Sequence, residues 1–134
     1  MGVVLTGFAD EIGPDPQLQI DTLSAVDVRF LELRAVGGKG VLDLDADEAT
    51  AFKCALDAAD IGVSSIGSPI GKVQVRSDLD AHFARFRIAV ESAQFFGARY
   101  VRVFSFYHEG EEASACREEV IDFFHRMVDV AESA

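Results

Sequence analysis

Residues 28–36 read VRFLELRAV, and this stretch decides which kind of fold the chain can adopt. Its apolar residues form an almost continuous run, which is typical of a strand covered on both faces, as in a parallel sheet. Side chains alternate along a strand, so Leu31 and Leu33 share one face, and Glu32 and Arg34 share the other. We therefore expect a buried strand whose second face carries charged groups.

Short apolar runs of this kind alternate with longer amphipathic runs along the whole chain, which is the signature of βαβ units. The expected strands span residues 3–8, 28–34, 62–66 and 100–106. Four strand–helix pairs make half of a (β/α)₈ barrel, whose usual length is about 250 residues. They also fit a single open doubly wound sheet of the flavodoxin type. A strand order of 2-1-3-4 would exclude the barrel.

The helices between these strands have recognisable ends. Asp15 is placed as an N-cap before Pro16 at the first helical position. Asp45 and Glu48 have the spacing of a capping box, and Gly97 stands where a helix would end. The last helix is expected from about residue 117, with one face formed by Val120, Phe124, Met127, Val128 and Ala131.

Composition restricts the function. The 134 residues, 49% of them hydrophobic, suffice for one globular domain, residues 1–134, and the net charge of −11 opposes binding to nucleic acid or an anionic membrane. A small polar ligand is expected instead. Cys54 and Cys116 lack metal-ligand spacing, and the first residues lack a signal sequence, so reduced thiols and a cytoplasmic location are expected.

Charged residues mark the second and fourth expected strands. In a barrel, alternate strands contribute to the same interior layer, which brings Glu32 within reach of Arg102. The pair has two interpretations: an ion pair that only satisfies its own members, or a pocket floor where the arginine fork orients a sugar hydroxyl or a phosphate.

The glycine-rich run from Gly67 to Lys72 is not a nucleotide-binding P-loop. Its glycines are one residue too close together, and Val73 follows the lysine where Ser or Thr is required. Among the histidines, His82 and His125 are expected to pack or face solvent. His108 follows a strand end, where barrel enzymes keep their active sites.

Four segments together resemble one known family. GFADEIGPD, FLELRAVGGKGVLDL, VSSIGSPIGK and YVRVFSFY follow in order, and they are similar to the xylose isomerase-like barrels, in particular to the branch described as sugar phosphate isomerases/epimerases. The resemblance implies proton transfer next to a carbonyl of a sugar or sugar phosphate, assisted by a divalent Mn, Mg or Zn ion. In that family the metal ligands come mainly from strands five to eight.

The resemblance therefore places the sequence on the N-terminal half of the barrel and implies that the chain alone is inactive. The expected pocket wall is formed by Phe8, Glu11, Glu32, Arg34, Ser68, Lys72, Arg102, Ser105 and Tyr107, with His108 beside them. A half-barrel exposes the edges of its first and last strands, so we expect a homodimer or pairing with a C-terminal half. The alternative is a self-associating binding or structural module without catalysis.

Overall fold

The computed structural model describes residues 2–110 and 112–134, and its centre is a parallel sheet. The sheet has three strands in the order β1-β4-β5. They are β1 (Phe30–Leu33), β4 (Gly62–Gly67) and β5 (Tyr100–Arg102). The four α-helices are α1 (Pro16–Ala25), α2 (Ala46–Ala58), α3 (Leu79–Phe96) and α4 (Ala113–Glu132).

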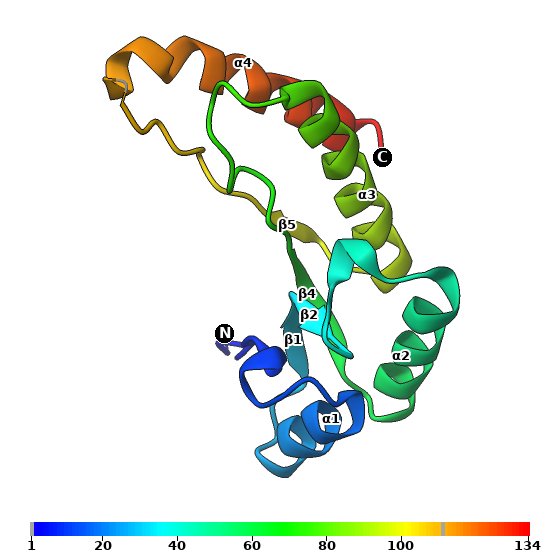
Figure 1. The fold of residues 1–134 in the computed structure, drawn as a ribbon. Coiled ribbons are helices and arrows are strands. Elements are labelled where there is room, and N and C mark those ends of the chain that lie inside the picture. Colours follow the sequence, from blue (N-terminus) through cyan, green and yellow to red (C-terminus); the bar gives the residue numbers. More distant parts are fainter. Residues whose placement is uncertain (1, 111) are drawn as a thin grey trace.

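The helices cover one side of the sheet, with α1 and α2 near β1, α3 against β4 and β5, and α4 beside α3 (Figure 1). The predicted alternation along β1 is confirmed, since Leu31 and Leu33 are buried at 1% and 0% exposure while Glu32 is only partly buried. These leucines join Ile66 and the apolar faces of the helices in one core. Burial of this face holds the helices on the sheet.

The predicted helix ends are confirmed. Asp15 accepts a hydrogen bond from the Leu18 amide at 2.9 Å, and Asp45 and Glu48 form a complete capping box. Gly97 adopts a left-handed φ of 70° at the end of α3. The last helix begins at Ala113, earlier than expected. Its buried residues are Cys116, Phe123 and Met127. Of the expected face, Met127 is buried and Val120 and Phe124 pack partly buried against the core, whereas Val128 and Ala131 are exposed.

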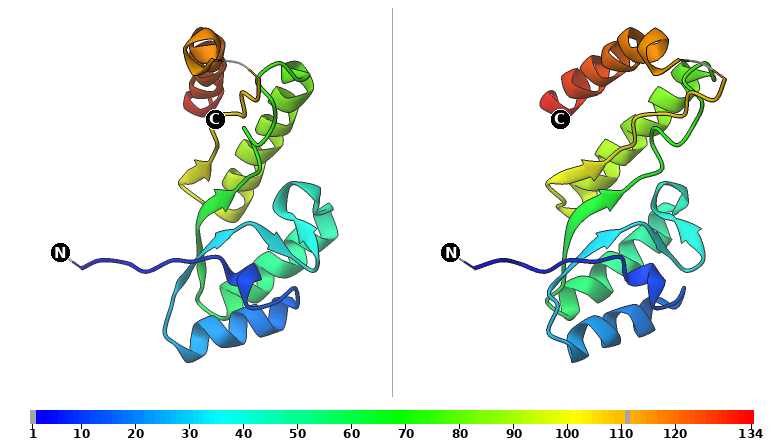
Figure 2. Two further views of the ribbon diagram at one scale, coloured as in Figure 1. Left: turned by 60° about the vertical axis from the view of Figure 1, so that its left-hand side comes forward. Right: turned by 90° about the vertical axis from the view of Figure 1, so that its left-hand side faces the viewer.

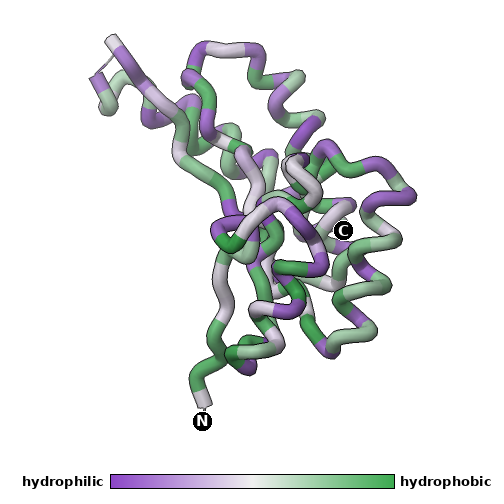
Figure 3. Tube along the Cα trace, turned by 60° about the horizontal axis from the view of Figure 1, so that its bottom comes forward, coloured by the Kyte–Doolittle hydropathy of each residue, from purple (hydrophilic) through white to green (hydrophobic). Residues whose placement is uncertain are grey.

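The expected strand over residues 3–8 is wrong. Gly7 forms one isolated parallel bridge with Leu31, and the residues before it extend away from the body (Figure 2). In that register residue 3 would lie opposite Asp27, whose φ of 56° belongs to a turn, so β1 offers no partner there. The apolar side chains of Val3, Val4 and Leu5 are 92%, 67% and 68% exposed. The trace near the N-terminus accordingly carries the colour of hydrophobic residues (Figure 3).

The strand expected over residues 100–106 ends at Arg102. The chain then leaves the sheet and runs beside the loop after β4, with the Phe104 amide donating to the Ile70 carbonyl at 2.7 Å. Phe106, with a φ of 72°, donates to the Gly71 carbonyl at 3.1 Å. Loop-to-loop hydrogen bonds thus replace the end of the expected strand.

The strand order distinguishes the two expected architectures. Gly7 contacts the edge of β1 opposite β4, so the segments follow one another across the sheet in chain order. That order is the one of a barrel, and a flavodoxin-like sheet would place its first strand between the second and third. The described part of the chain is therefore a mixed α/β structure consistent with a partial α/β barrel.

A small hairpin after β1 was not predicted. It consists of β2 (Ala35–Val36) and β3 (Lys39–Gly40), paired antiparallel around Gly37 and Gly38. Both glycines have positive φ, 62° and 77°, which suits a tight two-residue turn. The hairpin leads into the 3₁₀ turn η2 (Val41–Asp43), and a second such turn, η1 (Ala9–Glu11), precedes α1.

Candidate functional site

The site lies where the parallel strands end, on the side of the sheet opposite the core. Glu32 of β1 and Arg102 of β5 face one another across β4, with 3.6 Å between Glu32 Oε1 and Arg102 Nε. The predicted approach of these residues is confirmed. Both atoms are buried, and neither has a hydrogen-bond partner among the described residues. The pair therefore retains hydrogen-bonding capacity that a ligand can use.

The strand between them leaves room for this approach. Gly67 of β4 pairs with Arg102, and a Cβ at Gly67 would lie 3.0 Å from the Arg34 Cβ and 3.4 Å from the Leu33 carbonyl oxygen. A larger residue would push the end of β1 away. The glycine thus allows both arginines to approach the same end of the sheet.

Arg34 is anchored by the turn before α1. It donates from Nε to Asp10 at 2.7 Å and also pairs with Glu11, and these hydrogen bonds, that to Asp10 first, raise the pKa of its guanidinium above the ordinary value. Its Cζ lies 4.6 Å from the centre of the Phe8 ring. Three of the expected wall residues therefore lie together, Phe8, Glu11 and Arg34.

The other two cations of the site, Arg102 and Lys72, lie against phenylalanine rings. Arg102 Cζ lies 4.9 Å from the centre of the Phe8 ring and 4.9 Å from that of Phe104. Lys72 Nζ lies 4.9 Å from the same Phe104 ring. Aromatic faces attract cations, so the Phe104 ring holds Lys72 and Arg102 close together, and Arg102 also lies beside the Glu32 carboxylate.

The other expected wall residues lie apart from this group. Ser68 is fully buried, and its hydroxyl donates to the Arg102 carbonyl at 2.6 Å and accepts from the Ile70 amide at 3.3 Å, which holds the loop. Ser105, Tyr107 and His108 line a separate hollow of about 680 Å³ beside the first turns of α4.

His82, on α3, helps to position the loop after β4. Its Nε2 accepts a hydrogen bond from the Gly71 amide at 2.7 Å, and its ring packs near those of Phe106 and Phe123. Burial, and secondarily the charge of Arg85, lowers the pKa of this imidazole. His82 therefore packs as expected, and His125 is exposed.

Sequence reasoning missed several members of the site, namely Asp10, Arg85, Phe104 and the hairpin with η2. The hairpin and η2 form one wall of a pocket of about 180 Å³, which Arg34, Lys72, Arg85 and Arg102 also line. Arg85 reaches it from α3 and donates to Asp43 at 2.9 Å. Arg85 and Asp43 are 42 residues apart in sequence, so no local pattern could have predicted their ion pair. The hairpin did have a local signal, because adjacent glycines such as Gly37 and Gly38 are typical of a tight turn.

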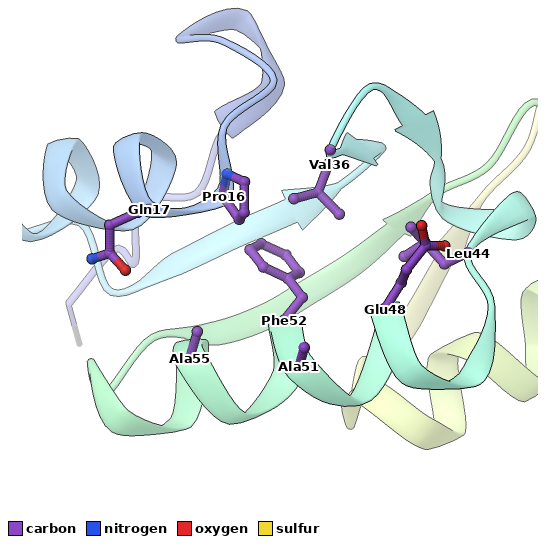
Figure 4. A pocket seen from close by; sticks show the side chains of 9 residues that line it. Pro16, Gln17, Val36, Leu44, Glu48, Ala51, Phe52 and Ala55 are labelled. Atoms are coloured by element: carbon purple, nitrogen blue, oxygen red, sulfur yellow. The ribbon is translucent and has the colours of Figure 1, made fainter.

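A second pocket, of about 310 Å³, lies between α1, α2 and the hairpin. Phe52 projects from α2 toward Pro16 and Val36 (Figure 4). Its lining is mainly apolar, and its acidic side chain, Glu48, already belongs to the capping box and pairs with Lys39. This pocket offers little polar chemistry to a ligand.

The described residues do not fit a divalent metal ion. No three His, Cys, Asp or Glu side chains in residues 2–110 and 112–134 lie close enough together to hold one. None of the described helices has the length and apolar character needed to cross a membrane.

Comparison with known proteins supports the fold. No protein-family model matches the sequence, and no curated protein matches it. Among solved structures, it is similar to a xylose isomerase domain protein from Planctomyces limnophilus, with a TM-score of 0.65 and 16% identity. The match covers 97% of this chain and 50% of that structure, so the chain spans about half the length of its structural neighbour. The chain thus shares its fold with about half of that structure.

Proposed function

We propose that this chain forms the sugar-binding wall of a xylose isomerase-like barrel whose complete form acts as a sugar or sugar phosphate isomerase or epimerase. The observation that carries the proposal is the Glu32–Arg102 pair. It lies at the ends of parallel strands, where barrel enzymes bind substrates, and its facing atoms lack hydrogen-bond partners among the described residues.

Sugar binding needs hydrogen-bonding groups for the hydroxyls beside apolar surface for the C–H groups, and the site has both. A carboxylate accepts from sugar hydroxyls, and a guanidinium donates to hydroxyl or carbonyl oxygens with fixed geometry. Phe8 and Phe104 lie beside Arg102 and present apolar surface to the C–H groups of a sugar. Glu32 and Arg102 would thereby orient the substrate, with the proton transfer assigned to groups outside this chain.

Titration of the ¹⁵N-labelled chain with D-fructose tests the sugar-binding wall. We expect shifts of the amide signals around Glu32 and Arg102, and weaker binding by Glu32→Gln, which loses the charge but keeps its shape. Asp21→Gln, on the surface of α1, is the control for the change in net charge. Unchanged binding by Glu32→Gln would contradict the proposal.

Exchange with solvent tests the absence of catalysis by the chain alone. Proton transfer next to a carbonyl replaces the carbon-bound hydrogen by deuterium in D₂O. We expect no incorporation above the enzyme-free rate when the chain is incubated with D-fructose and Mn²⁺ or Mg²⁺. Incorporation that depends on the chain would show that its own residues catalyse the step.

A self-associating module is the second candidate, favoured by exposed apolar surface at the sheet edges. Val3, Val4 and Leu5 are exposed in the segment before the Gly7 bridge to β1, and Tyr100 is 66% exposed on β5 at the other edge. Two copies could place these edges together and close a barrel-like dimer. Sedimentation velocity of the intact chain and of a Val4→Lys variant tests this. A monomer at every concentration would exclude it.

A further inference from the structure

The pocket beside the Glu32–Arg102 pair has an unusual concentration of cations. Its volume is about 180 Å³, and its lining brings together Arg34 after β1, Lys72 after β4, Arg85 of α3 and Arg102 of β5. Asp43 is the acidic residue among the lining residues. The chain as a whole carries a net charge of −11, so this gathering of cations runs against its overall composition.

Two of the four cations form hydrogen-bonded ion pairs. Arg34 is paired with Asp10 and Glu11, and Arg85 is paired with Asp43 at 2.9 Å. Asp10 and Glu11 are not part of the pocket lining, so they balance the charge of Arg34 from outside it. These pairs fix the two arginines in place and leave part of each guanidinium fork for a ligand.

The other two cations have hydrogen-bond donors to spare. Within residues 2–110 and 112–134, no carboxylate lies at ion-pair distance from Lys72, whose Nζ lies against the Phe104 ring. Arg102 contacts the same ring, and its Nε has no hydrogen-bond partner at 3.6 Å from Glu32. Two like charges at one ring repel each other unless an anion lies between them. The arrangement therefore favours an anionic ligand.

We propose that this pocket binds the phosphoryl group of a phosphorylated sugar, with Lys72 and Arg102 as its principal donors. The proposal rests on the proposed function and specifies its substrate class. Pockets that take whole small-molecule ligands measure about 300–1,000 Å³, so a pocket of about 180 Å³ takes one group of the ligand. Arginine offers a planar fork to phosphoryl oxygens and lysine a point charge. Glu32, across Arg102, remains for the sugar hydroxyls.

Four ligands and two variants test the subsite. The ligands are D-fructose, its terminal phosphate ester, the corresponding sugar acid with a carboxylate in place of the phosphate, and inorganic phosphate. Titration calorimetry on the intact chain compares the wild type with Lys72→Gln. Lys53→Gln makes the same change in net charge on α2, away from the pocket. We expect the ester to bind at least about tenfold more tightly than D-fructose, and Lys72→Gln to weaken it about tenfold. Lys53→Gln should leave it unchanged, and thermal unfolding checks that both variants fold.

The other possible outcomes distinguish a failure of the phosphoryl subsite from a failure of the proposed sugar-binding function. Equal affinity for the ester and D-fructose, unaffected by Lys72→Gln, would overturn the subsite and leave the sugar-binding wall standing. Binding of the sugar acid as tight as that of the ester would overturn the assignment to a phosphoryl group. Lys72-dependent binding of inorganic phosphate without binding of either sugar would support the anion subsite and overturn the proposed function. Binding of no probe would overturn both.

Discussion

The two faces of the β1-β4-β5 sheet differ in what they bury. On the helix-covered face, Leu31, Leu33 and Ile66 are at most 1% exposed and belong to one core. On the opposite face, the side chains of Glu32 and Arg102 are 19% and 29% exposed, and their facing atoms make no hydrogen bond. The first face stabilises the fold by apolar burial, whereas the second keeps polar groups available for a ligand.

The largest expected effect comes from Gly71, in the loop that connects β4 to α3. Gly71 has a φ of 84°, and a Cβ added there would lie 1.8 Å from the Phe104 carbonyl oxygen. Gly71→Ala should force the loop after β4 away from the segment after β5. We expect a loss of more than about 4 kcal/mol in the free energy of unfolding, or failure to fold. Urea denaturation measures it.

Gly37 supplies the matched control for Gly71. Its φ of 62° is similarly left-handed, but a Cβ there would meet nothing within 4 Å. Gly37→Ala should therefore cost only the backbone strain, about 1–2 kcal/mol. Equal losses in the two variants would mean that the close contact with Phe104 does not constrain the loop.

The second prediction concerns the apolar face. Leu33 has 0% exposure, and Leu33→Ala removes buried methyl groups and leaves a cavity, at a cost of about 2–5 kcal/mol. Leu18→Ala on α1 is the control, because that side chain is 46% exposed. A loss at Leu33 no greater than that at Leu18 would contradict the assignment of this face as the core.

The third prediction concerns the neighbouring residue on the opposite face. Glu32→Gln should lower the free energy of unfolding by less than about 1 kcal/mol, because the ion pair is partly exposed and makes no hydrogen bond. The same variant is expected to weaken sugar binding. A stability loss as large as that of Leu33→Ala, with binding intact, would make Glu32 a structural residue.

Local patterns predicted much of the fold. The side-chain alternation of residues 28–34 and the caps at Asp15, Asp45 and Gly97 depend on neighbours within a few residues, and all of these features are present. The strand over residues 3–8 failed because its pairing depends on the turn at Asp27 in another segment. The end of β5 likewise depends on the path of the loop after β4.

The candidate site was likewise predictable only where local patterns and strand order determine a contact. The Glu32–Arg102 contact follows from alternation and strand order. The contact of Lys72 with the Phe104 ring requires the positive φ values at Gly71 and Phe106, and the Arg85–Asp43 pair joins residues distant in sequence. No pattern of residue types marks such contacts in advance.

The smallest expected effect is a dependence of stability on pH through His82. Its imidazole accepts a hydrogen bond from the Gly71 amide, and burial lowers its pKa below the usual value near 6.5. The folded state therefore disfavours the proton more than the unfolded state does, so the stabilisation is fully present above about pH 6.5 and is lost as the pH falls toward the lowered pKa. The urea midpoint of the wild type should decrease over that range.

His82→Gln separates this contribution from that of the other titrating groups. The glutamine oxygen can still accept from the Gly71 amide, but the side chain does not titrate. The difference in urea midpoint between the wild type and His82→Gln should therefore change in favour of the variant as the pH falls below about 6.5. A difference that stays constant with pH would mean that protonation of His82 does not disturb the loop, and that Gly71 is held by its contact with the segment after β5 alone.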